Sequence, residues 1–125
     1  MPIVHIHLRE GKAADYLKKV SDAIHEALVP IIKIPADDRF HIIHQHAPEG
    51  MIAHPTYGGV TRSADVIILE ITVSAGRSVD IKKALYAEIV SRLEKAGVRP
   101  DDVVIALTEV AKENWSFGGG RATYA

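Results

Sequence analysis

The residue with the most distinctive chemistry is Pro2, which directly follows the initiator methionine. An internal proline nitrogen is an amide and cannot act as an acid or a base. Removal of Met1 would turn it into a secondary amine, and an ordinary α-amino group has a pKa of about 8. Burial in an apolar pocket lowers the pKa of such a cation, whereas a nearby carboxylate raises it. Pro2 can therefore serve as a general base or as a general acid, depending on its surroundings.

Seven histidines call for a test of metal binding. His5 and His7 would share one face of a strand, as would His44 and His46. Two such pairs can in principle bind zinc, but no carboxylate or cysteine stands beside them at ligand spacing. We therefore expect packed or hydrogen-bonded histidines, with no metal site and no cofactor.

Composition limits the other classes of function. The chain has 125 residues and no cysteine, which suits one domain and excludes thiolate catalysis and cysteine-bound zinc. Its 15 basic and 16 acidic residues nearly balance, so no positive excess predicts binding to nucleic acid or to a membrane surface. No apolar run approaches the ~20 residues of a membrane span, and no signal peptide is visible. We expect a single cytoplasmic domain over residues 1–125.

The first half of the chain has the pattern of a β-α-β unit that would position Pro2 at the start of a strand. Residues 3–8 are rich in β-branched side chains and predict that strand. Residues 17–31 carry apolar side chains every three or four positions, which predicts a helix. Pro30 is expected to end or kink this helix, and residues 40–45 form a second predicted strand.

The second half repeats the pattern. Residues 66–73 predict a strand, Ser78 is placed to cap a helix that Gly97 ends, and residues 103–110 predict the last strand. The apolar residues expected to line the buried face of this helix are Ile81, Ala84, Leu85, Ile89, Val90, Leu93 and Ala96.

The two copies, residues 2–46 and 66–110, agree in their spacing. Three pairs of residues are each separated by 65 positions: Gly11 and Gly76, Lys12 and Arg77, and Pro35 and Pro100. Because a parallel β-α-β unit has one preferred hand, two units side by side predict a four-stranded sheet with both helices on one face, an α/β (α+β) fold. The strand at 66–73 is apolar on both sides, so we expect other subunits to cover the open face. The glycines beside Trp115 in the tail predict an ordered turn or a C-terminal hairpin.

Four separated motifs in the chain resemble those of a known family. Residues 35–40 read Pro-Ala-Asp-Asp-Arg-Phe, and residues 45–46 read Gln-His. Residues 100–107 read Pro-Asp-Asp-Val-Val-Ile-Ala-Leu, and residues 115–122 read Trp-Ser-Phe-Gly-Gly-Gly-Arg-Ala. Together with Pro2, these motifs resemble the tautomerase superfamily, and within it the malonate semialdehyde decarboxylase-like family, over nearly the whole chain. The resemblance implies the tautomerase (MIF-like) fold and a homotrimer.

The resemblance also implies roles for individual residues. Pro2 would be the catalytic amine, Asp38 its acidic partner, and Arg77 the cation that binds and polarises the carboxylate of the substrate. The family has a second arginine two positions before Arg77, where this chain has Ala75. Structural alternatives remain open: Pro2 can simply open a strand, Asp38 can cap a turn, and Arg77 can be a solvated residue at a helix entry.

The C-terminal motif supplies the predicted substrate-binding residues Trp115, Phe117 and Arg121. In the family, Trp115 and Phe117 match aromatic residues of the pocket wall. Aromatic residues of this kind are more often core than pocket, and these two can be both.

Two classes of function follow. The first hypothesis is a cofactor-independent enzyme, either a tautomerase of a small 2-oxo acid or a decarboxylase of the 3-oxo acid malonate semialdehyde. A 2-oxo acid needs one cation for its carboxylate, and Arg77 suffices. Because this chain has Ala75 where the family has an arginine, we rank tautomerisation first and decarboxylation second. The second hypothesis is a non-catalytic binding or assembly module, since doubled β-α-β folds host many functions.

Overall fold

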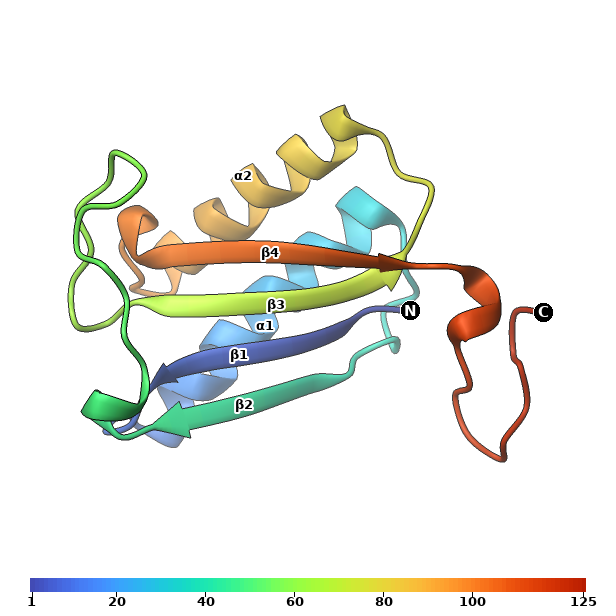
Figure 1. Cartoon of the computed structure of the whole chain (residues 1–125), viewed down its shortest axis with the longest axis horizontal. Helices are drawn as coiled ribbons and strands as arrows, with labels where there is room; N and C mark the ends of the chain where they lie inside the picture. The colour runs from blue at the N-terminus through green and yellow to red at the C-terminus, as the bar shows by residue number, and fades with distance from the viewer.

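The computed structural model describes all residues from Met1 to Ala125 (Figure 1). Its helices and strands, in chain order, are β1 (Ile3–Arg9), α1 (Ala14–Ile32), β2 (His41–His46), β3 (Ile67–Ser74), α2 (Val79–Lys95) and β4 (Val103–Val110). Three single turns of 3-10 helix cover Pro48–Gly50, Pro100–Asp102 and Lys112–Asn114. Neither helix combines the length and the apolar character that crossing a bilayer would require.

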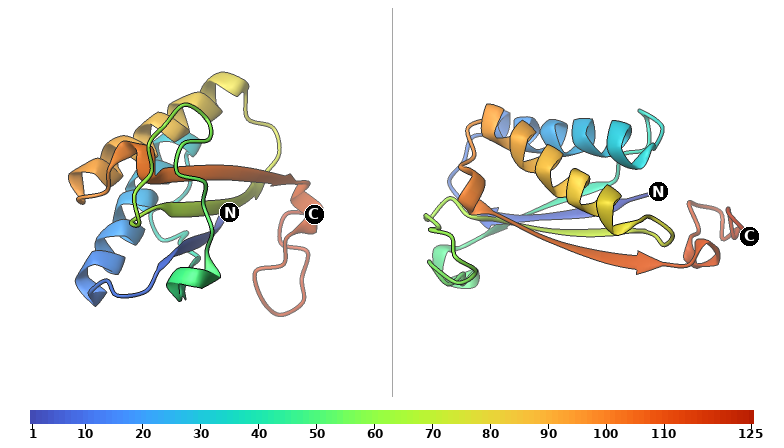
Figure 2. Two further views of the ribbon diagram at one scale, coloured as in Figure 1. Left: turned by 60° about the vertical axis from the view of Figure 1, so that its left-hand side comes forward. Right: turned by 90° about the horizontal axis from the view of Figure 1, so that it is seen from above.

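The four strands form one mixed sheet in the order β2-β1-β3-β4. Each β-α-β unit contributes a parallel pair, β1 with β2 and β3 with β4, and the two units meet through the antiparallel pair of β1 and β3. Both helices pack on the same face of the sheet (Figure 2). The architecture predicted from the internal repeat is confirmed.

Alternation along the central strands creates the core between the sheet and the helices. Val4 and Ile6 of β1 and Leu69 and Ile71 of β3 are buried under the helices, with at most 1% of their surface exposed. Burial of each such side chain contributes roughly 1.5–3 kcal/mol relative to exposure. Because these residues face the helices, the residues that alternate with them lie on the opposite, open face of the sheet.

Helix α1 runs past the proline that was expected to interrupt it. Pro30 lies inside the helix, which continues to Ile32 and ends with Lys33 in the left-handed conformation at φ 56°. In the last turn, Pro30 removes only the hydrogen bond that its N–H would donate to the carbonyl of Glu26, an exposed residue. Water can replace that donor, so the prediction that Pro30 ends the helix is wrong.

Helix α2 has the predicted ends but a shorter buried stripe. The Ser78 hydroxyl accepts a hydrogen bond from the Ile81 N–H at 3.2 Å, and Gly97 adopts φ 95° after the last turn. Leu85, Ile89 and Leu93 are buried as predicted, whereas Ile81 is 39% exposed and Ala84 is also exposed. Periodicity identifies the apolar face of a helix but not how much of its length a neighbouring element covers.

The C-terminal segment, residues 111–125, reverses direction without forming the strands of a hairpin (Figure 1). Gly118, Gly119 and Gly120 have φ angles of 144°, 67° and 72°, which interrupt any extended run. The reversal instead relies on an edge-to-face contact between Phe117 and Tyr124, whose ring centroids lie 4.8 Å apart. The expected β-hairpin is therefore replaced by a loop.

The open face of the sheet is not uniformly apolar. Four histidines stack there as a ladder, with hydrogen bonds from His5 to His44 (2.8 Å) and from His7 to His46 (2.9 Å). The carboxylate of Glu70 on β3 accepts a hydrogen bond from His7 Nε2 at 2.7 Å. Desolvation, followed by the neighbouring histidines, lowers the pKa of His44. No three histidine or acidic side chains are arranged to hold a metal ion.

His41 of β2 lies on the opposite, helix-covered face and makes stability depend on pH. Its Nδ1 atom lies 2.7 Å from the Ser21 hydroxyl, while its Nε2 atom is buried without a partner. Burial lowers the pKa of His41 to about 4, assisted by the positive charges of Arg39 and His25. The unfolded chain thus binds this proton near pH 6.5 and the folded chain only near pH 4.

We expect the free energy of unfolding to fall as the pH is lowered from 6.5 to 4, by at most ~3 kcal/mol through His41. His41→Gln, which keeps a hydrogen-bonding side chain but cannot titrate, should lose that part of the pH dependence. Urea unfolding of both proteins across this pH range measures the difference. Identical pH profiles would contradict the assignment.

Candidate active site

A cleft of about 520 Å³ opens on one side of the molecule, where the N-terminus meets the end of α1, the end of β3 and the C-terminal segment. It is lined by Met1, by residues 33–35 after α1, by residues 74–77 at the end of β3, and by Lys112 and Tyr124. The cleft therefore collects segments that lie far apart in the sequence.

The register of the central strands explains this meeting. β1 and β3 are antiparallel, and Ile3 lies opposite Thr72. The start of β1 is therefore beside the end of β3, so the buried Pro2 and the cleft residue Arg77 come to the same end of the sheet. The pairing of the two repeats creates the site, since neither repeat alone contains both ends.

The N-terminal amine forms an ion pair with Asp38. In the chain with Met1 attached, the α-amino nitrogen lies 3.3 Å from Asp38 Oδ2, and the side chains of Met1 and Asp38 are only 6% and 14% exposed. The same nitrogen donates to the Tyr124 hydroxyl at 3.4 Å. The nitrogen of Pro2 is the next along the backbone, within about 4 Å of the Met1 nitrogen. In a chain beginning at Pro2, the amine would therefore lie within about 7 Å of the same carboxylate oxygen.

Arg77 is held in a fixed orientation by the backbone. Its guanidinium donates to the carbonyl of Ser74 and to the carbonyl of Ile32, both at 3.0 Å. A guanidinium has five N–H donors, so donors remain for a ligand in the cleft. The two anchors join the end of β3 to the end of α1 and place the cation between them.

None of the three residues predicted from the C-terminal motif lines the cleft, and Trp115 supports its wall through Ser74. It is 7% exposed, and its Nε1–H donates to the hydroxyl of Ser74 at 3.0 Å. Phe117 is 38% exposed and packs against Tyr124, so it supports the cleft through that ring. Arg121 lies next to Gly119 and does not line the cleft.

Sequence reasoning missed three lining residues, namely Lys33, Lys112 and Tyr124. None of them belongs to a regular motif. Their positions become adjacent only when the fold brings together the segment after α1, the turn after β4 and the C-terminal tail. The unusual Lys33 backbone, at φ 56°, has no signal in the local sequence because glycine is the usual residue there.

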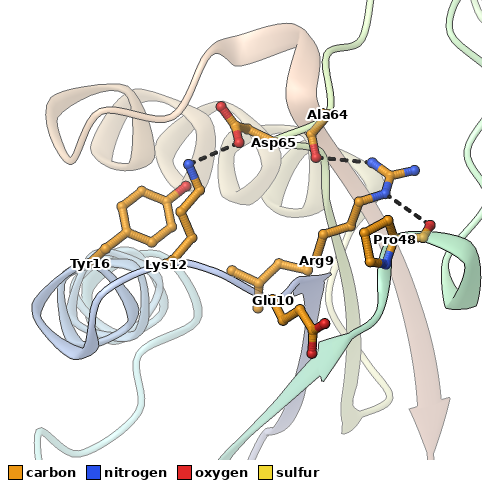
Figure 3. Close-up of a pocket in the computed structure, with 8 residues that line it drawn as sticks. Arg9, Glu10, Lys12, Tyr16, Pro48, Ala64 and Asp65 are labelled. Atoms are coloured by element: carbon orange, nitrogen blue, oxygen red, sulfur yellow. Dashed lines mark hydrogen bonds and ion pairs between the residues drawn. The ribbon is translucent and has the colours of Figure 1, made fainter.

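The opposite end of the sheet holds the counterpart produced by the internal repeat, a pocket of about 230 Å³ (Figure 3). Lys12, which corresponds to Arg77, pairs there with Asp65 at 2.8 Å. Arg9 donates to the carbonyls of Ala64 and Met51 at 2.9 and 2.8 Å. Both cations are thus satisfied within the chain and no terminal amine is present, so the repeat leaves one end open for ligand chemistry.

Comparison with known proteins agrees with the geometry. Two family models, both described as tautomerase enzyme, match residues 38–118 and residues 2–60. The chain belongs to the tautomerase enzyme family. A probable tautomerase of Bacillus subtilis strain 168, YusQ, is 41% identical over 123 residues, which cover 98% of this chain and 97% of YusQ.

Solved structures place this tautomerase-superfamily enzyme near the malonate semialdehyde decarboxylases. FG41 malonate semialdehyde decarboxylase, inhibited by 3-bromopropiolate, is 38% identical with a TM-score of 0.93, covering 98% of this chain and 93% of that one. A fused 4-OT, solved as a symmetric trimer, is 21% identical with a TM-score of 0.80, covering 98% and 97%. The second likeness shows the shared fold.

The anchoring of Arg77 generates a prediction. Arg77→Lys keeps one positive charge but loses the two-carbonyl anchor and the planar fork, so we expect kcat/KM for an oxo acid to fall about 100-fold. Steady-state kinetics beside thermal unfolding would separate this loss from a loss of fold. Arg92→Lys on α2, outside the cleft, is the matched control. Equal effects of the two substitutions would refute a special role for Arg77.

Proposed function

We propose that this enzyme catalyses keto–enol tautomerisation of a small 2-oxo acid through the secondary amine of Pro2, after removal of Met1 and without a cofactor. The observation that carries the proposal is the pair between the N-terminal amine and Asp38, 3.3 Å apart, in a cleft shared with Arg77. An amine that exchanges a proton and a cation that binds a carboxylate are the two groups this reaction needs.

The groups divide the work between binding and proton transfer. Arg77 would hold the carboxylate of the substrate with its free N–H donors. Pro2 would carry a proton between the hydroxyl oxygen of the enol and the adjacent carbon. Asp38 favours the charged form of the amine, whereas burial of Pro2 favours the neutral form. Because these effects oppose each other, the amine can exchange protons near neutral pH.

Decarboxylation of malonate semialdehyde is the second candidate, favoured by the 38% identity to FG41 malonate semialdehyde decarboxylase. Loss of carbon dioxide from a 3-oxo acid requires negative charge to be stabilised on the β-carbonyl oxygen. Protonated Pro2 and Arg77 can supply that stabilisation. We rank this reaction second because the exposed cleft residue at position 75 is alanine, where the resembling family has an arginine.

We also propose a cytoplasmic homotrimer in which the open sheet face is buried between subunits. The symmetric trimer of the fused 4-OT supports this assembly. Ile42, on the open face of β2, is 46% exposed in the single chain. Burial of this side chain between subunits would stabilise the assembly.

Processing of the N-terminus is the first test. The purified protein should have the mass of a chain that begins at Pro2, and Pro2→Ala should lower kcat/KM for phenylenolpyruvate ketonisation at least ~100-fold. The thermal unfolding of the variant should remain close to that of the parent. Full activity in a preparation that retains Met1 on every molecule would exclude the proposed amine.

Position 75 distinguishes the two reactions. Ala75→Arg adds a second arginine to the cleft and should raise malonate semialdehyde decarboxylation by about tenfold, since a charged hydrogen bond contributes roughly 1.5–3 kcal/mol. Assays of both reactions on the parent and the variant measure this shift. Unchanged decarboxylation would remove the reason for ranking tautomerisation first.

A further inference from the structure

The cleft is lined by more positive charges than are needed to bind one carboxylate. Arg77, Lys33 and Lys112 all line it, and no acidic residue does. Two carboxylates near it are already paired: Asp38 with the N-terminal amine, and Glu109, which lies beside Gly76 and Arg77, with Lys82. A cleft lined by three cations and no acidic residue favours a ligand that carries more than one negative charge.

The two lysines are not neutralised within the chain. Four other lysines form ion pairs with carboxylates at 2.6–3.1 Å: Lys12, Lys18, Lys19 and Lys82. Lys33 and Lys112 have no carboxylate within ion-pair distance, although both line the same cleft. Their ammonium groups are therefore available to a bound anion.

The backbone of Lys33 has a conformation that glycine adopts more easily than lysine. Lys33 is the single non-glycine residue with positive φ, at 56°, whereas eight glycines occupy the other such positions. After the helix of the second repeat, the left-handed conformation falls on a glycine: Gly97 has φ 95° and lies two residues beyond the end of α2. Glycine adopts this conformation without the steric cost that lysine incurs.

Lys33 is also fixed next to the catalytic end of the cleft. Arg77 donates to the carbonyl of Ile32, the residue that immediately precedes Lys33. The left-handed turn and the Arg77 anchor therefore hold one cation beside another. Lys112 approaches from the turn after β4, on a different segment of the same cleft.

We propose that Lys33 and Lys112 form a second anion subsite, so that the substrate is a small oxo acid carrying a second carboxylate. This inference rests on the proposed function, in which Arg77 takes the first carboxylate. The second carboxylate would orient the substrate along the cleft and leave its oxo or enol group at Pro2. A substrate with one carboxylate would use Arg77 alone and bind more weakly.

The test compares dicarboxylate with monocarboxylate substrates in three variants. We expect Lys33→Gly and Lys112→Gln each to lower kcat/KM for the enol of oxaloacetate about tenfold. Their kcat/KM for phenylenolpyruvate should change by less than about twofold. Lys83→Gln removes the same charge from the exposed face of α2 and should alter neither value.

Lys33→Gly carries a second readout. Because glycine suits the left-handed position, the variant should unfold about 3–5 °C higher than the parent while losing its preference for the dicarboxylate. A gain in thermal stability with an unchanged substrate ratio would overturn the subsite, since folding would then be the whole effect of this position.

Binding of inert acids tests the subsite independently of catalysis. Succinate should raise the unfolding temperature of the parent protein more than butyrate at equal concentration, and the difference should vanish in the Lys33→Gly, Lys112→Gln double variant. If the parent ketonises neither enol, the proposed function fails and this measurement alone decides the subsite. Equal effects of succinate and butyrate on the parent would overturn it.

Discussion

The antiparallel pairing of β1 with β3 is the constraint on which the rest of the structure depends. Each β-α-β unit could form its parallel strand pair alone, but the register that sets Ile3 opposite Thr72 joins the units into one sheet. That register brings the N-terminus to the end of β3. Because of it, the terminal amine, which pairs with Asp38, lies at the same cleft as Arg77.

The internal repeat places corresponding segments at the two ends of the sheet. Differences between the side chains at these two ends explain where chemistry can occur. At one end, Lys12 is neutralised by Asp65 and Arg9 is held by backbone carbonyls. At the other end, Arg77 is held by carbonyls while Lys33 has no carboxylate partner. Only the latter end receives the chain terminus. A duplicated scaffold thus separates a structural end from a candidate active site.

Much of this was accessible from the sequence because it depends on local patterns. Alternation in the strands, the Ser78 cap and the spacing of the repeat predicted the sheet and both helices. The site was accessible in part: motifs proposed Pro2, Asp38, Arg77 and Trp115, and of these Arg77 lines the cleft. Lys33 was not, since its importance arises from a backbone conformation and from contacts between distant segments. The hairpin predicted for the tail failed because three consecutive glycines adopt positive φ angles.

The most direct test of the account is a nitrogen NMR titration of the processed protein, labelled with ¹⁵N-proline. Of the six prolines, only Pro2 would carry an amine rather than an amide. The account predicts one proline nitrogen that titrates, and whose midpoint falls when Asp38→Asn removes the paired carboxylate. A spectrum in which no proline nitrogen titrates, or a midpoint that ignores Asp38, would contradict the central claim.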